Sequence, residues 1–182
     1  HITSALVLIA AEELNIDPNQ ITVAQTRTGS SPNENYTVGS QSMQHSGYAI
    51  KKAAATARKV LKAQAAKYFD VPVERIRIED GHLFVDETNQ RISYWELAKD
   101  GELGCDVDET AEVKNPSKHE LQGKYHVSIE MLDIVTGRHE FIQDLKLPNM
   151  LHARVIRPPQ YHSTLLELDE NLLDKLEACL LY

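Results

Sequence analysis

The sequence predicts an α+β fold in which helices pack on one face of a sheet. Three observations support this prediction. Residues 47–69 are rich in Ala, Lys and Leu, which favour a long helix. Two apolar runs flank Asp80-Gly81, a pair typical of a tight hairpin turn. Residues 10–23 and 65–78 match at a spacing of 55, each resembling a helix end, a turn and a strand. Duplication, convergent packing and coincidence would each explain this repeat.

The first predicted element is a helix that begins near Thr3 or Ser4 and ends at Asn15. Four apolar residues follow helical spacing in it: Leu6, Ile9, Ala10 and Leu14. Residues 20–25 alternate between apolar and polar side chains, which predicts a strand. Residues 28–47 are rich in Ser, Gly, Asn and Thr, so we expect a long loop before the helix of residues 47–69.

The hairpin at Asp80-Gly81 joins predicted strands at residues 75–79 and 82–85. Residues 92–101 then predict a strand end that enters a short helix. Ser93 is its expected N-cap, and Glu96, three residues later, completes a capping box.

The second half of the chain carries weaker signals. Residues 100–122 are acidic and poor in apolar residues, which indicates a linker or surface loop. Residues 129–135 predict one or two helical turns that end at Gly137. Strands are expected at residues 139–142, 152–156 and 164–168, and a short helix at residues 169–176. We therefore divide the chain into residues 1–100, a linker at 101–122, and residues 123–182.

Composition excludes several classes of function. The chain has 182 residues, 42% of them hydrophobic, and a net charge of -8, so nucleic acid and anionic membrane surfaces are poor partners. Its basic residues between 51 and 62 are expected to spread over a solvated helix face: Lys51, Lys52, Arg58, Lys59 and Lys62. No apolar run is long enough to cross a bilayer, and no signal peptide is visible. The sequence opens without Met and ends on an apolar run, so we expect a fragment of a longer protein.

Reactive groups in recognisable arrangements are missing from the sequence. Cys105 and Cys179 suit neither a disulfide framework nor a metal motif, and the eight histidines never pair at metal-ligand spacing. No nucleophile motif and no Walker loop occurs. We therefore assign no catalytic residue and no metal ligand.

The candidate binding segment is the loop of residues 31–47. Thr37, Ser40 and Ser42 supply hydroxyl groups, and Gly39 lets a ligand approach the backbone. Because the loop enters the start of a helix, its N–H groups and the helix dipole suit an anionic or polar ligand. The alternative is a flexible loop that ends in an N-cap serine.

Three stretches carry a resemblance to a known family. Residues 4–16 ("SALVLIAAEELNI"), 26–61 ("TRTGSSPNENYTVGSQSMQHSGYAIKKAAATARKVL") and 135–159 ("VTGRHEFIQDLKLPNMLHARVIRPP") occur in the family's order. They resemble the molybdopterin-binding large subunit of the xanthine dehydrogenase and aldehyde oxidase family, in particular the isoquinoline 1-oxidoreductase beta-subunit type. The last stretch resembles the start of the family's α/β hammerhead domain, a scaffold that needs no reacting groups.

The resemblance implies a fold, a cofactor and a reaction. It implies a molybdopterin-binding-like domain followed by part of a hammerhead domain. It implies hydroxylation of a small molecule, either beside the nitrogen of an N-heterocycle or at an aldehyde carbon. The molybdenum would be held by molybdopterin, as a cytosine dinucleotide, and the electrons would leave through an iron–sulfur small subunit. The family's cofactor loop falls on five residues of this sequence: Thr37, Gly39, Ser40, Gln41 and Ser42.

Departures from the family pattern give local predictions. Asn35 and Asn149 stand where the family has glycine, and both turns are expected to survive because asparagine tolerates a positive φ. Residues 130–137 lack the family's proline and lysine, so a helical turn is expected there.

Two hypotheses of function follow. The first is a fragment of a molybdenum hydroxylase large subunit that is inactive in isolation, binds no cofactor alone, and lacks the base glutamate of the later part. The alternative is a non-catalytic binding or interaction module that keeps the fold. The resemblance points to a bacterial protein of either the periplasm or the cytoplasm.

Overall fold

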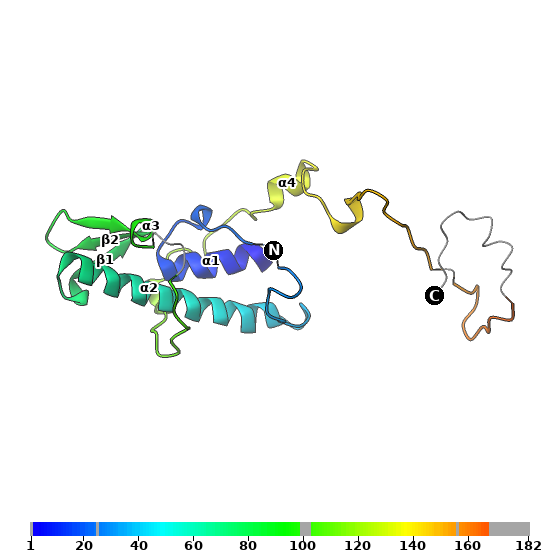
Figure 1. Cartoon of the computed structure of the whole chain (residues 1–182), viewed down its shortest axis with the longest axis horizontal. Coiled ribbons are helices and arrows are strands. Elements are labelled where there is room, and N and C mark those ends of the chain that lie inside the picture. Colours follow the sequence, from blue (N-terminus) through cyan, green and yellow to red (C-terminus); the bar gives the residue numbers. More distant parts are fainter. Residues whose placement is uncertain (1, 25, 99–102, 156, 168–182) are drawn as a thin grey trace. The chain divides into compact units, whose positions relative to one another are not determined.

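Two parallel helices form the frame of the protein in the computed structural model, which describes residues 2–24, 26–98, 103–155 and 157–167. The chain divides into two units, residues 1–132 and residues 133–182, and each is described by itself. In the first unit α1 (Ile2–Leu14) packs along α2 (Gly47–Phe69), with the N-termini of both helices at the same end (Figure 1). Gly47 allows this approach, because a Cβ there would lie 3.2 Å from Ile9 Cδ1.

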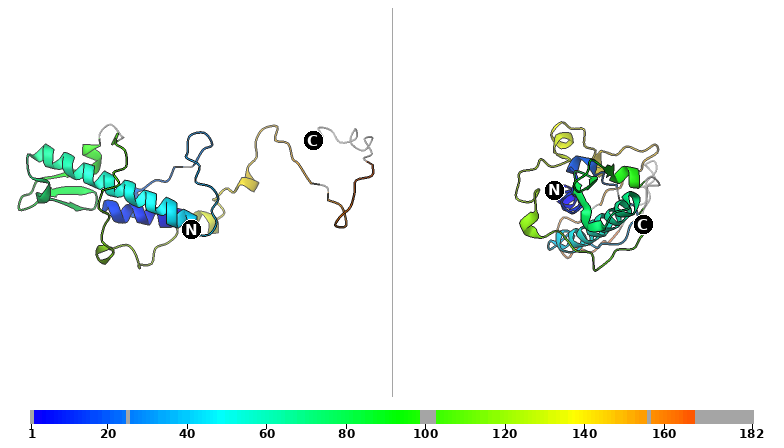
Figure 2. Two further views of the ribbon diagram at one scale, coloured as in Figure 1. Left: turned by 90° about the horizontal axis from the view of Figure 1, so that it is seen from below. Right: turned by 90° about the vertical axis from the view of Figure 1, so that its left-hand side faces the viewer.

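A three-stranded antiparallel sheet lies beside the C-terminal part of α2, as the views of Figures 1 and 2 agree. Its strands are β1 (Ile76–Glu79), β2 (His82–Val85) and β3 (Arg91–Ser93), in the order β1-β2-β3. Asp80 (φ 45°) and Gly81 (φ 71°) make the turn between β1 and β2. Both positive φ values suit the right-handed twist of a two-residue hairpin.

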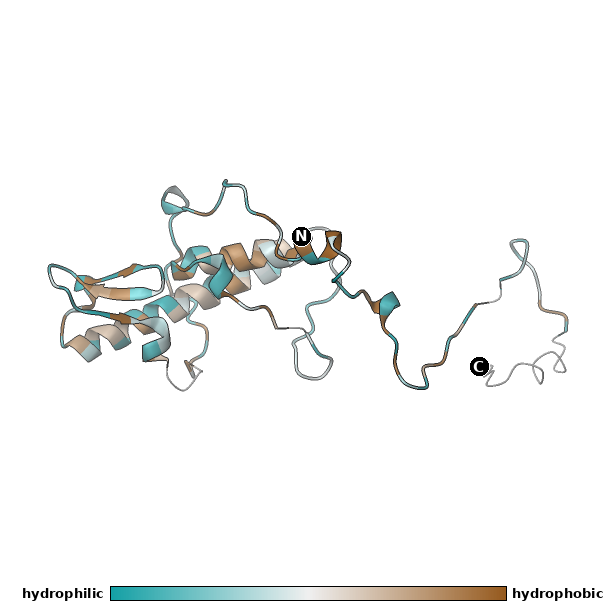
Figure 3. Ribbon diagram, turned by 90° about the horizontal axis from the view of Figure 1, so that it is seen from above, coloured by the Kyte–Doolittle hydropathy of each residue, from teal (hydrophilic) through white to brown (hydrophobic). Residues whose placement is uncertain are grey.

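The core lies between the sheet and α2. Its buried members come from both layers: Leu61, Ala65, Ala66, Ile76, Leu83, Val85, Ile92 and Tyr94. In Figure 3 the apolar residues that build it colour parts of the helices and strands brown. The short helix α3 (Tyr94–Leu97) closes one side, and Ser93 and Glu96 form its capping box. Helices and a small antiparallel sheet in one unit confirm the α+β class, and the hairpin, the capping box and the extent of α2 are confirmed as well.

The repeated segments share one backbone path over most of their length. Asn15 (φ 54°) and Asp70 (φ 55°) end α1 and α2 in the left-handed conformation. Equivalent 3-10 turns follow, η1 (Pro18–Gln20) and η3 (Val73–Arg75). The copies then diverge, because β1 pairs with β2 whereas the described residues 21–24 join no sheet. The strand predicted at residues 20–25 is therefore wrong within the described part, since an alternating pattern becomes a strand only when another strand pairs with it.

Residues 103–130 contain a single 3-10 turn, η4 (Pro116–Lys118), and otherwise irregular backbone. The short helix α4 (Met131–Val135) follows, and Gly137 (φ 71°) ends it. The irregular segment and the short helix that ends at Gly137 both agree with what the sequence predicts. Asn35 (φ 63°) and Asn149 (φ 58°) adopt the positive φ that was predicted where the family has glycine.

In the second unit the described residues after α4 hold one 3-10 turn, η5 (Ile142–Asp144). The described parts of the strands predicted at residues 139–142, 152–156 and 164–168 are not strands. Residues 156 and 168 and the helix predicted at 169–176 lie outside the described residues. Apolar side chains here are exposed, for example Ile142 (84%) and Leu166 (94%), so the described part of this unit offers the predicted strands no apolar layer to pack on. The hammerhead assignment and the division into residues 1–100, 101–122 and 123–182 stay predictions.

Candidate cofactor-binding site

The loop of residues 26–46 lies at the end of the helix pair where α1 and α2 begin (Figure 2). Its internal hydrogen bonds join residues of the loop to each other. Ser42 Oγ donates to Thr37 Oγ1 at 3.2 Å, and Ser46 Oγ donates to Glu34 Oε2 at 2.7 Å. The Asn35 N–H donates to Asn33 Oδ1 at 3.0 Å. These bonds fold the loop on itself and connect its two halves just before α2.

A tight turn projects from the middle of this loop. Its closing bond runs from the Gln41 N–H to Val38 O at 3.0 Å, and its central residues Gly39 (φ 55°) and Ser40 (φ 61°) are both left-handed. A left-handed serine costs about 1–3 kcal/mol, and such strain is concentrated at binding sites. In the part of the chain that the structure describes, the N–H groups of Gly39 and Ser40 donate to no protein acceptor. Two exposed donors therefore stand side by side on the turn.

The start of a helix reinforces these donors. The loop passes through one π-helical turn, η2 (Ser42–Ser46), directly into α2, and η2 also contacts α1. The positive end of the α2 dipole lies directly after the turn of Gly39 and Ser40. The electrostatics of this end therefore favour an anion.

Two open cavities flank the loop. The larger, of about 710 Å³, is lined by residues that include Arg27, Glu34, Thr37 and Ser42. The smaller, of about 370 Å³, is lined by Gln41 and His45 among others. The structure thus brings Thr37 and Ser42 together at the larger cavity and places Gln41 at the smaller one. Gly39 and Ser40 form the exposed turn that lies between Thr37 and Gln41 in the sequence.

Arg27 is a lining residue that sequence reasoning missed. It lines the larger cavity, and its backbone N–H donates to Ser31 Oγ at 3.0 Å, which ties it to the rest of the loop. An isolated arginine in a loop belongs to no motif, so its place beside Thr37 became evident only from the fold. Among the described residues, no group of His, Cys, Asp and Glu side chains could hold a metal ion. None of the described helices is both long and apolar enough to span a membrane.

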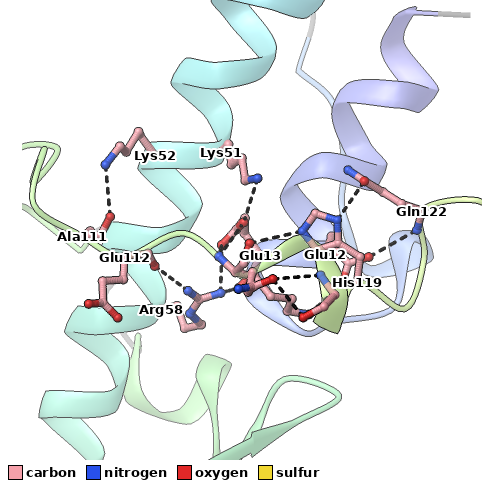
Figure 4. Close-up of polar contacts among 12 residues, drawn as sticks. Glu12, Glu13, Lys51, Lys52, Arg58, Ala111, Glu112, His119 and Gln122 are labelled. Carbon is pink, nitrogen blue, oxygen red and sulfur yellow. Dashed lines mark hydrogen bonds and ion pairs between the residues drawn. The ribbon is translucent and has the colours of Figure 1, made fainter.

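A second polar cluster, far more buried, lies on the other part of the helix pair (Figure 4). The Glu13 side chain, 1% exposed, accepts from Arg58 at 2.9 Å and from the Lys114 N–H at 2.9 Å. Lys51 Nζ lies 3.8 Å from the same carboxylate. The adjacent Glu12 is also buried and binds backbone N–H groups of residues 120–122.

This cluster corrects the interpretation of the basic residues of α2 as a solvated face. Lys52 Nζ donates to Glu109 O at 2.7 Å, and Arg58 donates to Glu112 O at 2.8 Å. Lys59 pairs with Asp108 at 2.6 Å. The physical reason is that residues 108–114 cross this face and present carbonyl and carboxylate oxygens to it, which a helical projection of the sequence does not reveal.

Three ionisable groups shift with their surroundings. Burial alone would raise the pKa of Glu12, but the bonds from Lys114 and from the backbone N–H groups of Leu121 and Glu120 lower it to about 2. The hydrogen bond from Lys59, with those from Thr110, holds the pKa of Asp108 well below its usual range. Burial raises the pKa of Tyr94, whose hydroxyl donates to Leu14 O at 2.8 Å.

The loop and the Glu12–Glu13 cluster differ in what they leave for a ligand. The acceptors of the cluster are already bound by protein donors, whereas the loop keeps two exposed backbone donors, an exposed serine and an arginine that lines the larger cavity. Such a donor set fits an anionic, highly oxygenated cofactor such as molybdopterin.

Comparison with known proteins identifies the class. Residues 2–142 match the family model of the molybdopterin cofactor-binding domain, so the chain belongs to this family. One relative is a nicotinate dehydrogenase subunit of Pseudomonas putida, 35% identical over 158 residues. That alignment covers 87% of this chain and 13% of the relative, so the chain spans about an eighth of the relative's length. Both matches support a molybdenum hydroxylase type of parent, while the isoquinoline 1-oxidoreductase type stays a prediction.

Proposed function

We propose that this chain supplies one wall of the molybdopterin site in a molybdenum hydroxylase large subunit. The observation that carries the proposal is the start of the helical segment of η2 and α2, which directly follows the turn of Gly39 and Ser40. The helix dipole and the exposed N–H groups of the turn suit the phosphate of the cofactor. The family match over residues 2–142 supports the same assignment.

Each residue of the loop has a defined part in this proposal. The N–H groups of Gly39 and Ser40 donate to the cofactor, and Gly39 permits its close approach. The Ser40 hydroxyl donates as well, and the Ser42 hydroxyl turns toward the cofactor from Thr37 Oγ1, to which it donates in this structure. Gln41 offers its amide from the side of the smaller cavity.

The reaction belongs to the complete protein. When bound, molybdopterin supplies the molybdenum centre for hydroxylation of an N-heterocycle or an aldehyde. The relative's name contains nicotinate, a pyridine carboxylate, which favours N-heterocycles among these substrates. We further propose the cytosine dinucleotide form of the cofactor, an iron–sulfur partner subunit, and the isoquinoline 1-oxidoreductase beta-subunit type. Residues 123–182 would then begin the hammerhead domain.

In isolation the chain is expected to bind no molybdenum and to hydroxylate nothing. A cofactor held from several sides loses the cooperation of its contacts when only one wall is present. Metal analysis of the purified chain tests this expectation. Stoichiometric molybdenum together with turnover of an N-heterocycle would overturn the fragment interpretation.

Gly39→Val, introduced into the complete parent protein, tests the site itself. A β-branched residue is strained at φ 55° and covers the exposed N–H groups, so we expect molybdenum content to fall at least tenfold. Gly104→Val is the matched control, because Gly104 has the same φ of 55° and equally free space but lies outside the loop. Unchanged molybdenum in Gly39→Val, or an equal loss in both variants, would refute the assignment of the loop.

A further inference from the structure

Residues 108–122, which we call the strap, lie on α1 and α2 with almost no apolar burial. Ala111 is the one buried side chain in this segment, all of which the structure describes. Polar bonds must therefore hold the strap in place. Its first half is bound by cations of α2, through Lys52, Arg58 and Lys59.

The second half of the strap closes around one carboxylate. Glu12 Oε2 accepts from the N–H groups of Leu121 at 2.7 Å, Glu120 at 3.0 Å and Gln122 at 3.3 Å. Glu12 Oε1 accepts from Lys114 Nζ at 2.7 Å. Three consecutive backbone donors and an ammonium group thus converge on a side chain that is 2% exposed.

We propose that these four donors form a carboxylate-binding site whose resident ligand is Glu12, and that its occupation fixes where the strap turns back along α1. The inference is independent of the proposed cofactor role. Consecutive N–H groups that point to one centre make an anion-binding concavity, and here the anion comes from the same chain.

The course of the chain after this site shows what the turn determines. Gly123, with φ 79°, follows the three donor residues directly. The chain then returns to the first turn of α1, where the Ile129 N–H donates to Ser4 Oγ at 3.0 Å and Ser4 Oγ lies 3.3 Å from Ser128 Oγ. Glu12 therefore controls the path of residues 123–129 toward the helix end that also carries the candidate cofactor loop.

The donor set explains why a carboxylate is needed. An ionised carboxylate has two oxygens that accept from several donors, whereas an amide side chain offers one acceptor and one donor group. A glutamine at this position would direct an NH₂ group toward Lys114 or toward the backbone N–H groups. The site takes a small monocarboxylate, of which formate and acetate are the simplest.

The test uses Glu12→Ala in this chain with hydrogen exchange read amide by amide. We expect the N–H groups of residues 120–122 and of Ile129 to exchange at least tenfold faster than in the wild type. Sodium formate is expected to restore protection at residues 120–122, and sodium chloride at equal ionic strength is not. Glu120→Ala is the matched control, since it removes an exposed carboxylate from the same turn and keeps the backbone donors.

Glu12→Gln keeps the inference testable if the alanine variant does not fold. It preserves the length of the side chain, and the expected change is faster exchange confined to residues 120–129. Wild-type exchange at residues 120–122 in Glu12→Gln would overturn the proposal. Formate that protects nothing in a folded Glu12→Ala variant would overturn the binding site as well.

Discussion

The strap and the loop of residues 26–46 are two irregular segments on the same pair of helices, yet they are held by opposite means. Bonds that fix the strap join residues far apart in sequence, such as Glu12 with Glu120 and Arg58 with Glu112. Bonds that fix the loop join residues of the loop itself, such as Thr37 with Ser42 and Glu34 with Ser46. The strap consumes its donors within the protein, whereas the loop leaves its turn open. One segment is therefore structural, and the other is suited to a ligand.

The difference predicts where a single lost charge matters most. Glu13→Gln should lower the free energy of unfolding by about 3–5 kcal/mol, because it leaves Arg58 and the Lys114 N–H without their buried anion. Chemical denaturation measures this loss. Glu79→Gln is the control, since Glu79 pairs with Arg77 on the exposed face and should change stability by less than about 0.5 kcal/mol. Equal effects of the two substitutions would mean that the buried carboxylate of Glu13 stabilises the protein no more than an exposed one and does not hold the strap.

Both segments depend on α2, so a core substitution there should weaken their common support. Leu61 is 4% exposed within the core, and Leu61→Ala should cost about 2–5 kcal/mol in chemical denaturation. Of the side chains that were expected in the core, Leu61 is buried, whereas Leu6, Ile9 and Phe69 are half-buried. Val38→Ala, in the loop, is a matched truncation of an exposed apolar residue and should be nearly neutral. A loss below about 0.5 kcal/mol for Leu61→Ala would contradict the observed packing.

A fall in pH is expected to weaken the bonds that hold the strap but not those that hold the loop. The folded-state pKa of Glu12, about 2, lies below the ordinary value of 4.5, so the ionised group stabilises the folded chain above about pH 4.5. That contribution is lost progressively as the pH falls from 4.5 through 2. The charged side chain bonded to Glu12 is Lys114 of the strap, and the adjacent Glu13 is paired with Arg58 and Lys51 of α2.

Amide resonances followed by NMR from neutral pH into the acid range measure this effect. The Leu121 N–H, which donates to Glu12, should shift as the acid range is entered, while the Gly39 N–H should not follow the same titration. Glu12→Gln serves as the control, because it should abolish the titration at Leu121. A common titration of both amides would show that the segments open together and that Glu12 does not govern the strap alone.

The smallest effect is expected within the loop. Ser42→Ala removes the hydroxyl that donates to Thr37 at 3.2 Å, an exposed bond worth about 0.5–1 kcal/mol at most. Thermal unfolding should therefore change little, whereas amide exchange of residues 37–42 should become faster. A large loss of stability from Ser42→Ala would mean that the loop, like the strap, is part of the structural framework.

Local chemistry accounts for the features that the sequence predicted well. The extent of α2, the Asp80-Gly81 hairpin and the Ser93 capping box depend on neighbours within a few residues. The positive φ at Asn35 and Asn149 is likewise a property of the residue and its turn. Hydroxyls and a glycine before a helix are also visible in the sequence, and the role of these residues in binding a cofactor stays a prediction.

Only the tertiary structure decided the rest. Residues 21–24 alternate as a strand does but find no pairing partner among the described residues, and Glu12 and Glu13 look like solvated helix residues until the strap covers them. Arg27 joins the residues that line the larger cavity through a chain path that no local pattern encodes. The physical reason is distance along the chain. Glu12 and Glu120 are 108 residues apart, and which donors reach a buried carboxylate across that span is settled by how the helices, the sheet and the strap pack together.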